Sequence, residues 1–78
     1  MVGKPLRFTK HAVMRILSLG FTEEDVAKAI AQSRRRREGK LKFKAAFRTK
    51  KGFLVVTCSD YADHILVITV GKGGEKNW

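Results

Sequence analysis

The chain of 78 residues has room for one domain, and an apolar fraction of 44% supplies enough side chains for a single compact core. Seventeen Lys and Arg against seven Asp and Glu give a net charge of +10, which favours a polyanionic partner such as a nucleic acid. The single cysteine excludes an internal disulfide, zinc-binding Cys and His spacings are absent, and no apolar run approaches the roughly 20 residues of a membrane span. These features predict a cytoplasmic protein without a metal, cofactor or membrane partner. The scarcity of Asn and Gln suggests a thermophilic source.

The first predicted helix follows a short extended segment, Leu6–Phe8. Apolar residues spaced three and four apart over Lys10–Leu19 indicate one buried helix face. Thr9 is placed to cap the first turn through its hydroxyl, and Gly20 suits the left-handed position that ends a helix.

The second predicted helix has a well-defined start. Thr22 and Asp25 have the spacing of a capping box, in which each side chain accepts a hydrogen bond from the backbone N–H of the other residue. Phe21 and Val26 flank this start at the positions of a hydrophobic staple. The helix is expected to continue to about Ser33.

Three strands are predicted in the C-terminal half, where the apolar pattern changes from a helical period to alternation. Alternation over Lys40–Arg48 indicates a strand with one apolar and one basic face. The more uniformly apolar Phe53–Cys58 is expected in the middle of the sheet, and His64–Val70 is expected to form the last strand.

The predicted fold is therefore α+β, with two N-terminal helices packed on a three-stranded antiparallel meander in the order ααβββ. A single domain is expected to span residues 1–78. Its ordered core covers about 6–71, and 72–78 is expected to be a flexible tail.

A basic cluster is the main candidate for a binding surface, because ten of the seventeen basic residues lie between Arg34 and Lys51. They are Arg34, Arg35, Arg36, Arg37, Lys40, Lys42, Lys44, Arg48, Lys50 and Lys51. The first four are expected around the end of the second helix, and the next four along one face of the first strand. Such a cluster can bind the phosphates of a nucleic acid. Alternatively, it is a solvated surface that keeps an edge strand from aggregating.

His11 and Arg15 are candidate catalytic residues, because positions four apart share a helix face. A His can exchange a proton near neutral pH and an Arg can stabilise charge on phosphorus, a pairing that suits RNA cleavage by a 2′-hydroxyl. Both can equally be surface residues. Thr69 has a hydroxyl in an apolar strand that needs a partner or an open site, with His64 and Thr57 as candidate neighbours. It can also be an ordinary strand residue.

Several segments resemble domain-of-unknown-function family 4258, a family of small bacterial and archaeal proteins. Phe8–Ala12 (FTKHA) followed by Arg15, and then Gly20–Val26 (GFTEEDV), is similar to the opening of that family. Ile65–Val70 (ILVITV) is similar to its final strand, which tends to carry a Thr in an apolar run. The resemblance covers about residues 6–70.

The resemblance implies an architecture like that of the RelE-like toxins, which are small basic ribonucleases, and it implies His11, Arg15 and Thr69 as site residues. The chain is accordingly predicted to bind nucleic acid, RNA more than DNA, as a ribonuclease toxin or as a non-catalytic relative. If it is an enzyme, we expect a metal-independent endoribonuclease. The alternative is a protein-interaction module whose basic surface binds an acidic partner such as an antitoxin. In that case an edge strand around Lys42–Lys44 is expected to accept an added strand.

Overall fold

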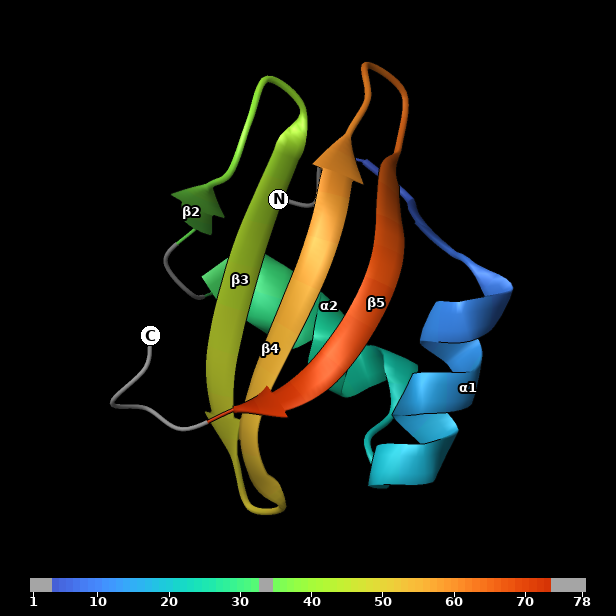
Figure 1. Cartoon of the computed structure of the whole chain (residues 1–78), viewed down its shortest axis with the longest axis vertical. Helices are drawn as coiled ribbons and strands as arrows, with labels where there is room; N and C mark the ends of the chain where they lie inside the picture. Colours follow the sequence, from blue (N-terminus) through green and yellow to red (C-terminus); the bar gives the residue numbers. More distant parts are fainter. Residues whose placement is uncertain (1–3, 33–34, 74–78) are drawn as a thin grey trace.

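A computed structural model describes residues 4–32 and 35–73 of the chain. Within these ranges the helices are α1 (Lys10–Leu19) and α2 (Glu23–Gln32), and the strands are β1 (Leu6–Phe8), β2 (Arg35–Arg37), β3 (Lys42–Thr49), β4 (Gly52–Asp60) and β5 (Ile65–Gly73). The five strands form one mixed sheet with the order β1-β5-β4-β3-β2. In Figure 1, α2 lies behind β3 and β4, and α1 lies alongside β5. Neither of these helices has the length and the apolar stretch needed to cross a membrane.

The first helix begins and ends as the sequence predicts. The hydroxyl oxygen of Thr9 accepts a hydrogen bond from the Ala12 N–H at 3.0 Å, which satisfies one of the free N–H groups of the first turn. Gly20 follows the helix with a φ of 81°, a left-handed conformation that glycine adopts without a steric penalty. Its N–H donates back to the Leu17 carbonyl at 3.3 Å.

The predicted capping box of α2 is confirmed. The Thr22 N–H donates to Asp25 Oδ2 at 3.0 Å, and the Asp25 N–H donates to Thr22 Oγ1 at 3.1 Å. Phe21 and Val26, the predicted staple residues, are both buried in the core. The predicted end of this helix, Ser33, lies outside the described residues.

The three long strands are antiparallel neighbours, and the central position predicted for β4 is confirmed. β4 begins at Gly52 and β5 continues to Gly73, so both strands are longer than predicted. Lys72 and Gly73, the start of the expected tail, belong to β5, whereas 74–78 lie outside the described part of the chain. A β-bulge leaves Ile68 as an extra residue in β5.

The predicted fold of two helices on a three-stranded antiparallel meander is wrong, because the sheet has five strands and is mixed. β1 pairs in parallel with β5, with Leu6 opposite Ile65. β2 pairs antiparallel with β3, with Arg36 opposite Lys44, so these arginines extend the sheet and do not surround the end of α2. Both strands have three residues, too few for alternation to show, and a run of arginines has no apolar face.

One face of the sheet and both helices enclose the core. Phe43 and Ala45 of β3 are buried, as are Leu54 and Val56 of β4, so alternate residues of each strand share this face. The helices and β5 contribute Ala12, Ile16, Val26, Ala29, Ile30, Ile65, Val67 and Val70. Burial of these apolar side chains supplies the main driving force for folding.

α1 also covers the edge of β5 beyond the segment that pairs with β1. The Thr9 hydroxyl donates to the Ile68 carbonyl at 2.8 Å, and Arg15 Nε donates to the Val70 carbonyl at 3.2 Å. These edge carbonyls would otherwise depend on water for a partner. Thr9 therefore holds α1 against β5 with the same hydroxyl that caps the helix.

Thr9→Val is expected to lower the free energy of unfolding by about 1–3 kcal/mol, because it removes a helix cap and a hydrogen bond together. Valine keeps the shape of threonine, so the loss reports the hydroxyl group. Thr57→Val is the matched control, since the Thr57 hydroxyl has no hydrogen bond among the described residues, and it should change stability by less than about 0.5 kcal/mol. Urea denaturation measures both values, and equal losses would contradict the role of Thr9.

Candidate nucleic-acid interface

The side of the sheet opposite the core, which we call the outward face, carries basic residues along β3. Because Phe43 and Ala45 are buried on the core side, the alternating Lys42, Lys44 and Arg48 lie on the outward face. Lys42 and Arg48 are exposed, and Lys44 is half-buried. Figure 1 views the molecule from this side, and neither α1 nor α2 lies over the face.

A first row of side chains crosses the outward face from β2 to β5. Arg36 is opposite Lys44 in the pairing of β2 with β3. Lys44 is in turn opposite Thr57 of β4, and Thr57 is opposite Thr69 of β5. Residues that pair across neighbouring strands share a face, so Thr69 lies in the same row as two cations.

A second row ends on a basic residue that the sequence prediction missed. Lys42 is opposite Ser59, which is opposite Leu66, and Leu66 is opposite Arg7 of β1. Arg7 is exposed, so it places a cation on the far side of the same face. In the sequence, Arg7 lies between two apolar residues, Leu6 and Phe8, and this alternation, although short, could have indicated a strand with an exposed cation.

Phe53 and Val55 form an apolar strip between the first row and the β3–β4 turn. They lie on the outward face because the residue between them is fully buried. Their partners on β5 are Gly73 and Gly71, which have no side chains to cover them, and a Cβ on Gly73 would lie 2.9 Å from Val55 Cγ2. On β3, Phe53 is opposite Arg48. An aromatic ring beside a cation is suited to stacking on a nucleic-acid base, a role for Phe53 that its apolar strand did not indicate.

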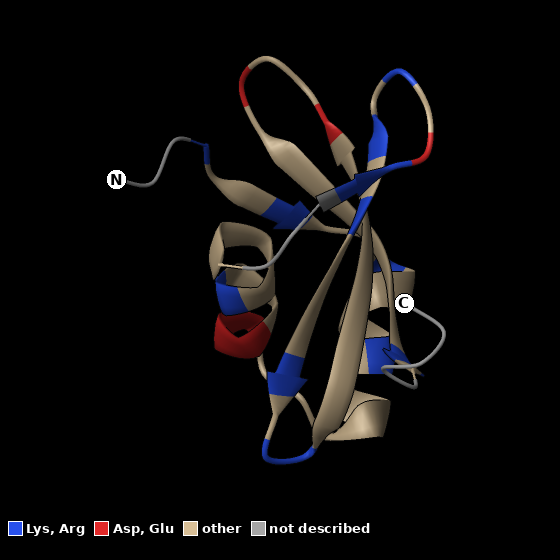
Figure 2. Ribbon diagram, turned by 90° about the vertical axis from the view of Figure 1, so that its left-hand side faces the viewer, with Lys and Arg blue, Asp and Glu red and all other residues tan. Residues whose placement is uncertain are grey.

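Two lysines on or beside this surface lie near acidic side chains. Among the described residues, Lys44 Nζ lies 3.9 Å from Glu38 Oε1 and Lys51 Nζ lies 3.5 Å from Asp25 Oδ2. Pairs of this length at partly exposed positions contribute little energy. Figure 2 shows Lys and Arg along β2, β3 and the turn after β3, whereas Asp and Glu lie mainly on α2 and near the β4–β5 turn. The positive charge is thus concentrated on one part of the molecule.

The remaining predicted binding residues lie around the ends of β3 and in β2. They are Lys40 in the turn before β3, Lys50 and Lys51 in the turn after it, and Arg37 in β2. The backbone of Arg35 belongs to β2, whereas its side chain and the whole of Arg34 lie outside the described residues.

The predicted catalytic residues come from α1 and β5. The bond from Arg15 to the Val70 carbonyl brings this side chain to the residue next to Thr69. Within the described part of the chain, the exposed His11 ring makes no hydrogen bond or ion pair, with Arg15, with Thr69 or with any other group. Arg15 therefore has a structural contact of its own, and the contacts present do not assemble the three residues into one site.

His64 lies apart from Thr69 at the β4–β5 turn. Its ring stacks on Tyr61 with centroids 4.9 Å apart, and its Nδ1 lies 2.8 Å from Asp63 Oδ1. Hydrogen bonds from His64 and from the Asp63 N–H lower the pKa of Asp63. Thr69 lies five positions after His64 along the extended chain, roughly 16 Å away, so of the two predicted neighbours only Thr57 lies beside Thr69.

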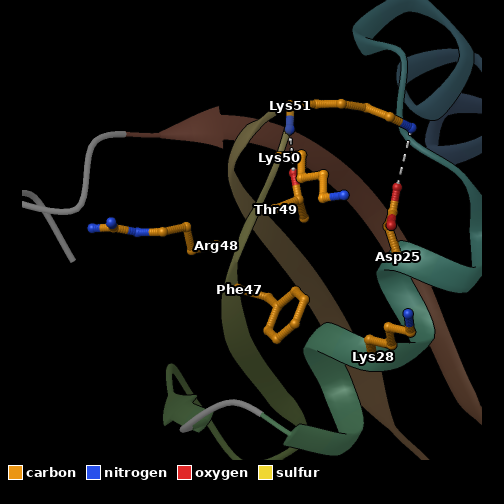
Figure 3. A pocket seen from close by; sticks show the side chains of 7 residues that line it. All are labelled: Asp25, Lys28, Phe47, Arg48, Thr49, Lys50 and Lys51. Atoms are coloured by element: carbon orange, nitrogen blue, oxygen red, sulfur yellow. Dashed lines mark hydrogen bonds and ion pairs between the residues drawn. The ribbon is translucent and has the colours of Figure 1, made fainter.

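An open depression lies between the start of α2 and the β3–β4 turn, with a volume of about 330 Å³ (Figure 3). Its lining residues are Asp25, Lys28, Phe47, Arg48, Thr49, Lys50 and Lys51. The side chains of Lys28, Lys50 and Lys51 extend toward the space beside Asp25, and the Phe47 ring points toward α2. Sequence reasoning missed this site, because it depends on the packing of α2 beside the turn.

Asp25 supplies the one carboxylate among the described residues of this lining. Partial burial raises the pKa of Asp25, but hydrogen bonds from Thr22 and the positive charge of Lys51 lower it by more, so the net shift is downward. The depression at neutral pH therefore contains one negative and several positive charges.

Comparisons of the chain with family models, with curated proteins and with solved structures found no match. The resemblance to domain-of-unknown-function family 4258 therefore stays a prediction. Within residues 4–32 and 35–73, no group of three His, Cys, Asp or Glu side chains is placed to hold a metal ion. The outward face and the depression are the features on which a function can be argued.

Arg15→Leu is expected to lower the free energy of unfolding by about 1 kcal/mol, because it removes the donor to the Val70 carbonyl. His11→Ala, on the same helix face, should change it by less than about 0.5 kcal/mol. Urea denaturation of the two variants measures the difference. If Arg15→Leu proved as stable as the wild type, the hydrogen bond from Arg15 to the Val70 carbonyl would not be contributing to the stability of the fold.

Asp25 is expected to make the free energy of unfolding depend on pH in the acidic range. Its pKa in the folded state is lowered, so it stabilises the fold above its unfolded pKa of about 3.9 and loses this contribution as the pH falls through the folded value. Between about pH 7 and about pH 3, Asp25→Asn should therefore lose less stability than the wild type. Glu23→Gln removes an exposed carboxylate from the same turn and is the control for the change in net charge. Urea denaturation at both pH values provides the test, and parallel losses in all three proteins would contradict it.

Proposed function

We propose that the chain binds a single-stranded nucleic acid, RNA in preference to DNA, across the outward face of its sheet. The observation that carries the proposal is the row of outward-facing cations Lys42, Lys44 and Arg48 on β3, with Arg48 directly opposite Phe53 of β4. Cationic side chains bind phosphates and release condensed counterions, and an aromatic ring stacks on a base of any sequence. Together they provide both kinds of contact that a single strand offers.

The helices support a sheet-based mode of binding. A DNA-recognition helix enters the major groove with its N-terminal residues near the bases. The first turn of α2 carries Glu23, Glu24 and Asp25, which would repel phosphates, and α1 is tied to β5 by Thr9 and Arg15. Sequence-specific RNA recognition mostly targets unstacked bases of single strands, and one common class of RNA-binding domain stacks such bases on the face of a sheet.

An acidic protein is the alternative partner, since the same cations attract carboxylates. The added strand expected around Lys42–Lys44 has no access to that edge, because β2 already pairs with Phe43–Ala45 of β3. An acidic peptide would also make no particular use of Phe53. A nucleic acid uses the cations and the ring together, so we favour it.

Lys42→Glu is expected to weaken binding of a single-stranded RNA oligonucleotide about tenfold at about 150 mM salt, because it replaces a phosphate contact with repulsion. The slope of log affinity against log salt should also become shallower by about 1. Lys10→Glu makes the same charge change at an exposed position of α1 and should have a smaller effect. Fluorescence anisotropy titrations measure both, and equal effects would place the binding surface elsewhere.

Phe53→Leu separates stacking from charge in the same assay. It should weaken binding by about 1–3 kcal/mol for the base that stacks on the ring, while the salt dependence stays that of the wild type. Binding of an acidic peptide, with no affinity for RNA or DNA at about 150 mM salt, would overturn the proposal in favour of the alternative.

A further inference from the structure

The depression between α2 and the β3–β4 turn differs from the outward face in shape and in charge. The outward face presents a row of separate cations along a strand. The depression is concave, and the ammonium groups of Lys28, Lys50 and Lys51 extend toward the same space within it. Lys51 Nζ lies 3.5 Å from Asp25, and Lys28 Nζ lies 3.7 Å from Glu24. Lys50 makes no ion pair with any described residue. The lining thus has a clear excess of positive charge.

This concentration of charge suits a terminal phosphate better than a phosphate inside a strand. A phosphodiester carries one negative charge, while a phosphomonoester carries about 1.5 to 2 at pH 7 and offers three strong acceptor oxygens. Three ammonium groups with one carboxylate in the lining match the larger charge. The negative charge of Asp25 offsets one of the three ammonium groups, and its carboxylate lies 3.5 Å from Lys51 Nζ.

The size and the apolar part of the depression fit one nucleotide. Its volume of about 330 Å³ is at the lower end of the range for ligand sites, which is too small for a duplex. The half-buried ring of Phe47 lies in the wall beside the lysines and offers a surface for one base.

The depression also lies where a strand on the outward face would end. Arg48 belongs both to the outward row of β3 and to the lining of the depression, and in Figure 3 its side chain extends away from Phe47. β2 pairs with Phe43–Ala45 and leaves the part of β3 around Arg48 outside that pairing. A strand can therefore pass over β3 at this point without crossing β2.

We propose that this depression binds the phosphorylated end of the single strand, with the phosphate among Lys28, Lys50 and Lys51 and the last base against Phe47. The inference rests on the proposed function, because it assumes that the rest of the strand lies on the outward face. It adds that the protein distinguishes a phosphorylated end from a hydroxyl end.

The test compares three RNA oligonucleotides of one sequence, with a 5′-phosphate, with a 3′-phosphate, or with hydroxyl groups at both ends. The wild type should bind one of the phosphorylated oligonucleotides about tenfold more tightly than the hydroxyl form. The double variant Lys28→Gln with Lys50→Gln should lose this preference and bind all three alike. Lys10→Gln, at an exposed position of α1, is the control and should keep it. Thermal unfolding of each variant confirms that the protein is folded.

The outcomes separate this inference from the proposed function. If the wild type bound all three oligonucleotides equally, terminal recognition would be overturned while binding to the outward face would stand. If it bound none of them, both would be overturned. A preference that persisted in the double variant would also overturn the inference, because the terminal phosphate would then bind elsewhere.

Discussion

The alternation of β3 decides where the charge of this protein lies. Phe43 and Ala45 are buried under α2, and successive side chains of a strand point to opposite faces, so Lys42 and Lys44 must lie on the outward face. A slip of one residue would bury the lysines and expose the phenylalanine, which fixes the register strongly. The same packing that forms the core therefore also forms the cationic surface.

The parts of the fold that could be predicted from the sequence are those set by local interactions. The cap of α1 and the capping box of α2 join residues three positions apart, so their spacing is visible in the chain. The pairing of Leu6 with Ile65 joins the two ends of the domain, and no local sequence pattern indicates it. β2 is near β3 in sequence, but its arginines have neither the apolar residues nor the alternation by which a strand is recognised.

The candidate site likewise contains residues that the sequence could place and residues that it could not. Lys42, Lys44 and Arg48 could be placed on one face because alternation within a single strand is enough. Arg7 and Phe53 join that face only through the pairing of β1 with β5 and of β3 with β4. The depression depends on a third level, the packing of α2 beside the β3–β4 turn. Residue placement that depends on alternation within one β-strand can thus be predicted from the sequence, whereas placement that depends on strand pairing or on helix packing cannot.

Two of the acidic residues of this chain hold the ends of its elements. Asp25 completes the capping box and pairs with Lys51 of the turn after β3, and Asp60 at the end of β4 lies 2.6 Å from Lys4 before β1. The cations of the outward face, which include Lys42, Lys44 and Arg48, repel one another in the folded state. A bound polyanion would remove this repulsion and, because it binds the folded state, would also stabilise it. Binding and stability are therefore coupled through the same lysines and arginines, most strongly at low salt, where screening is weakest.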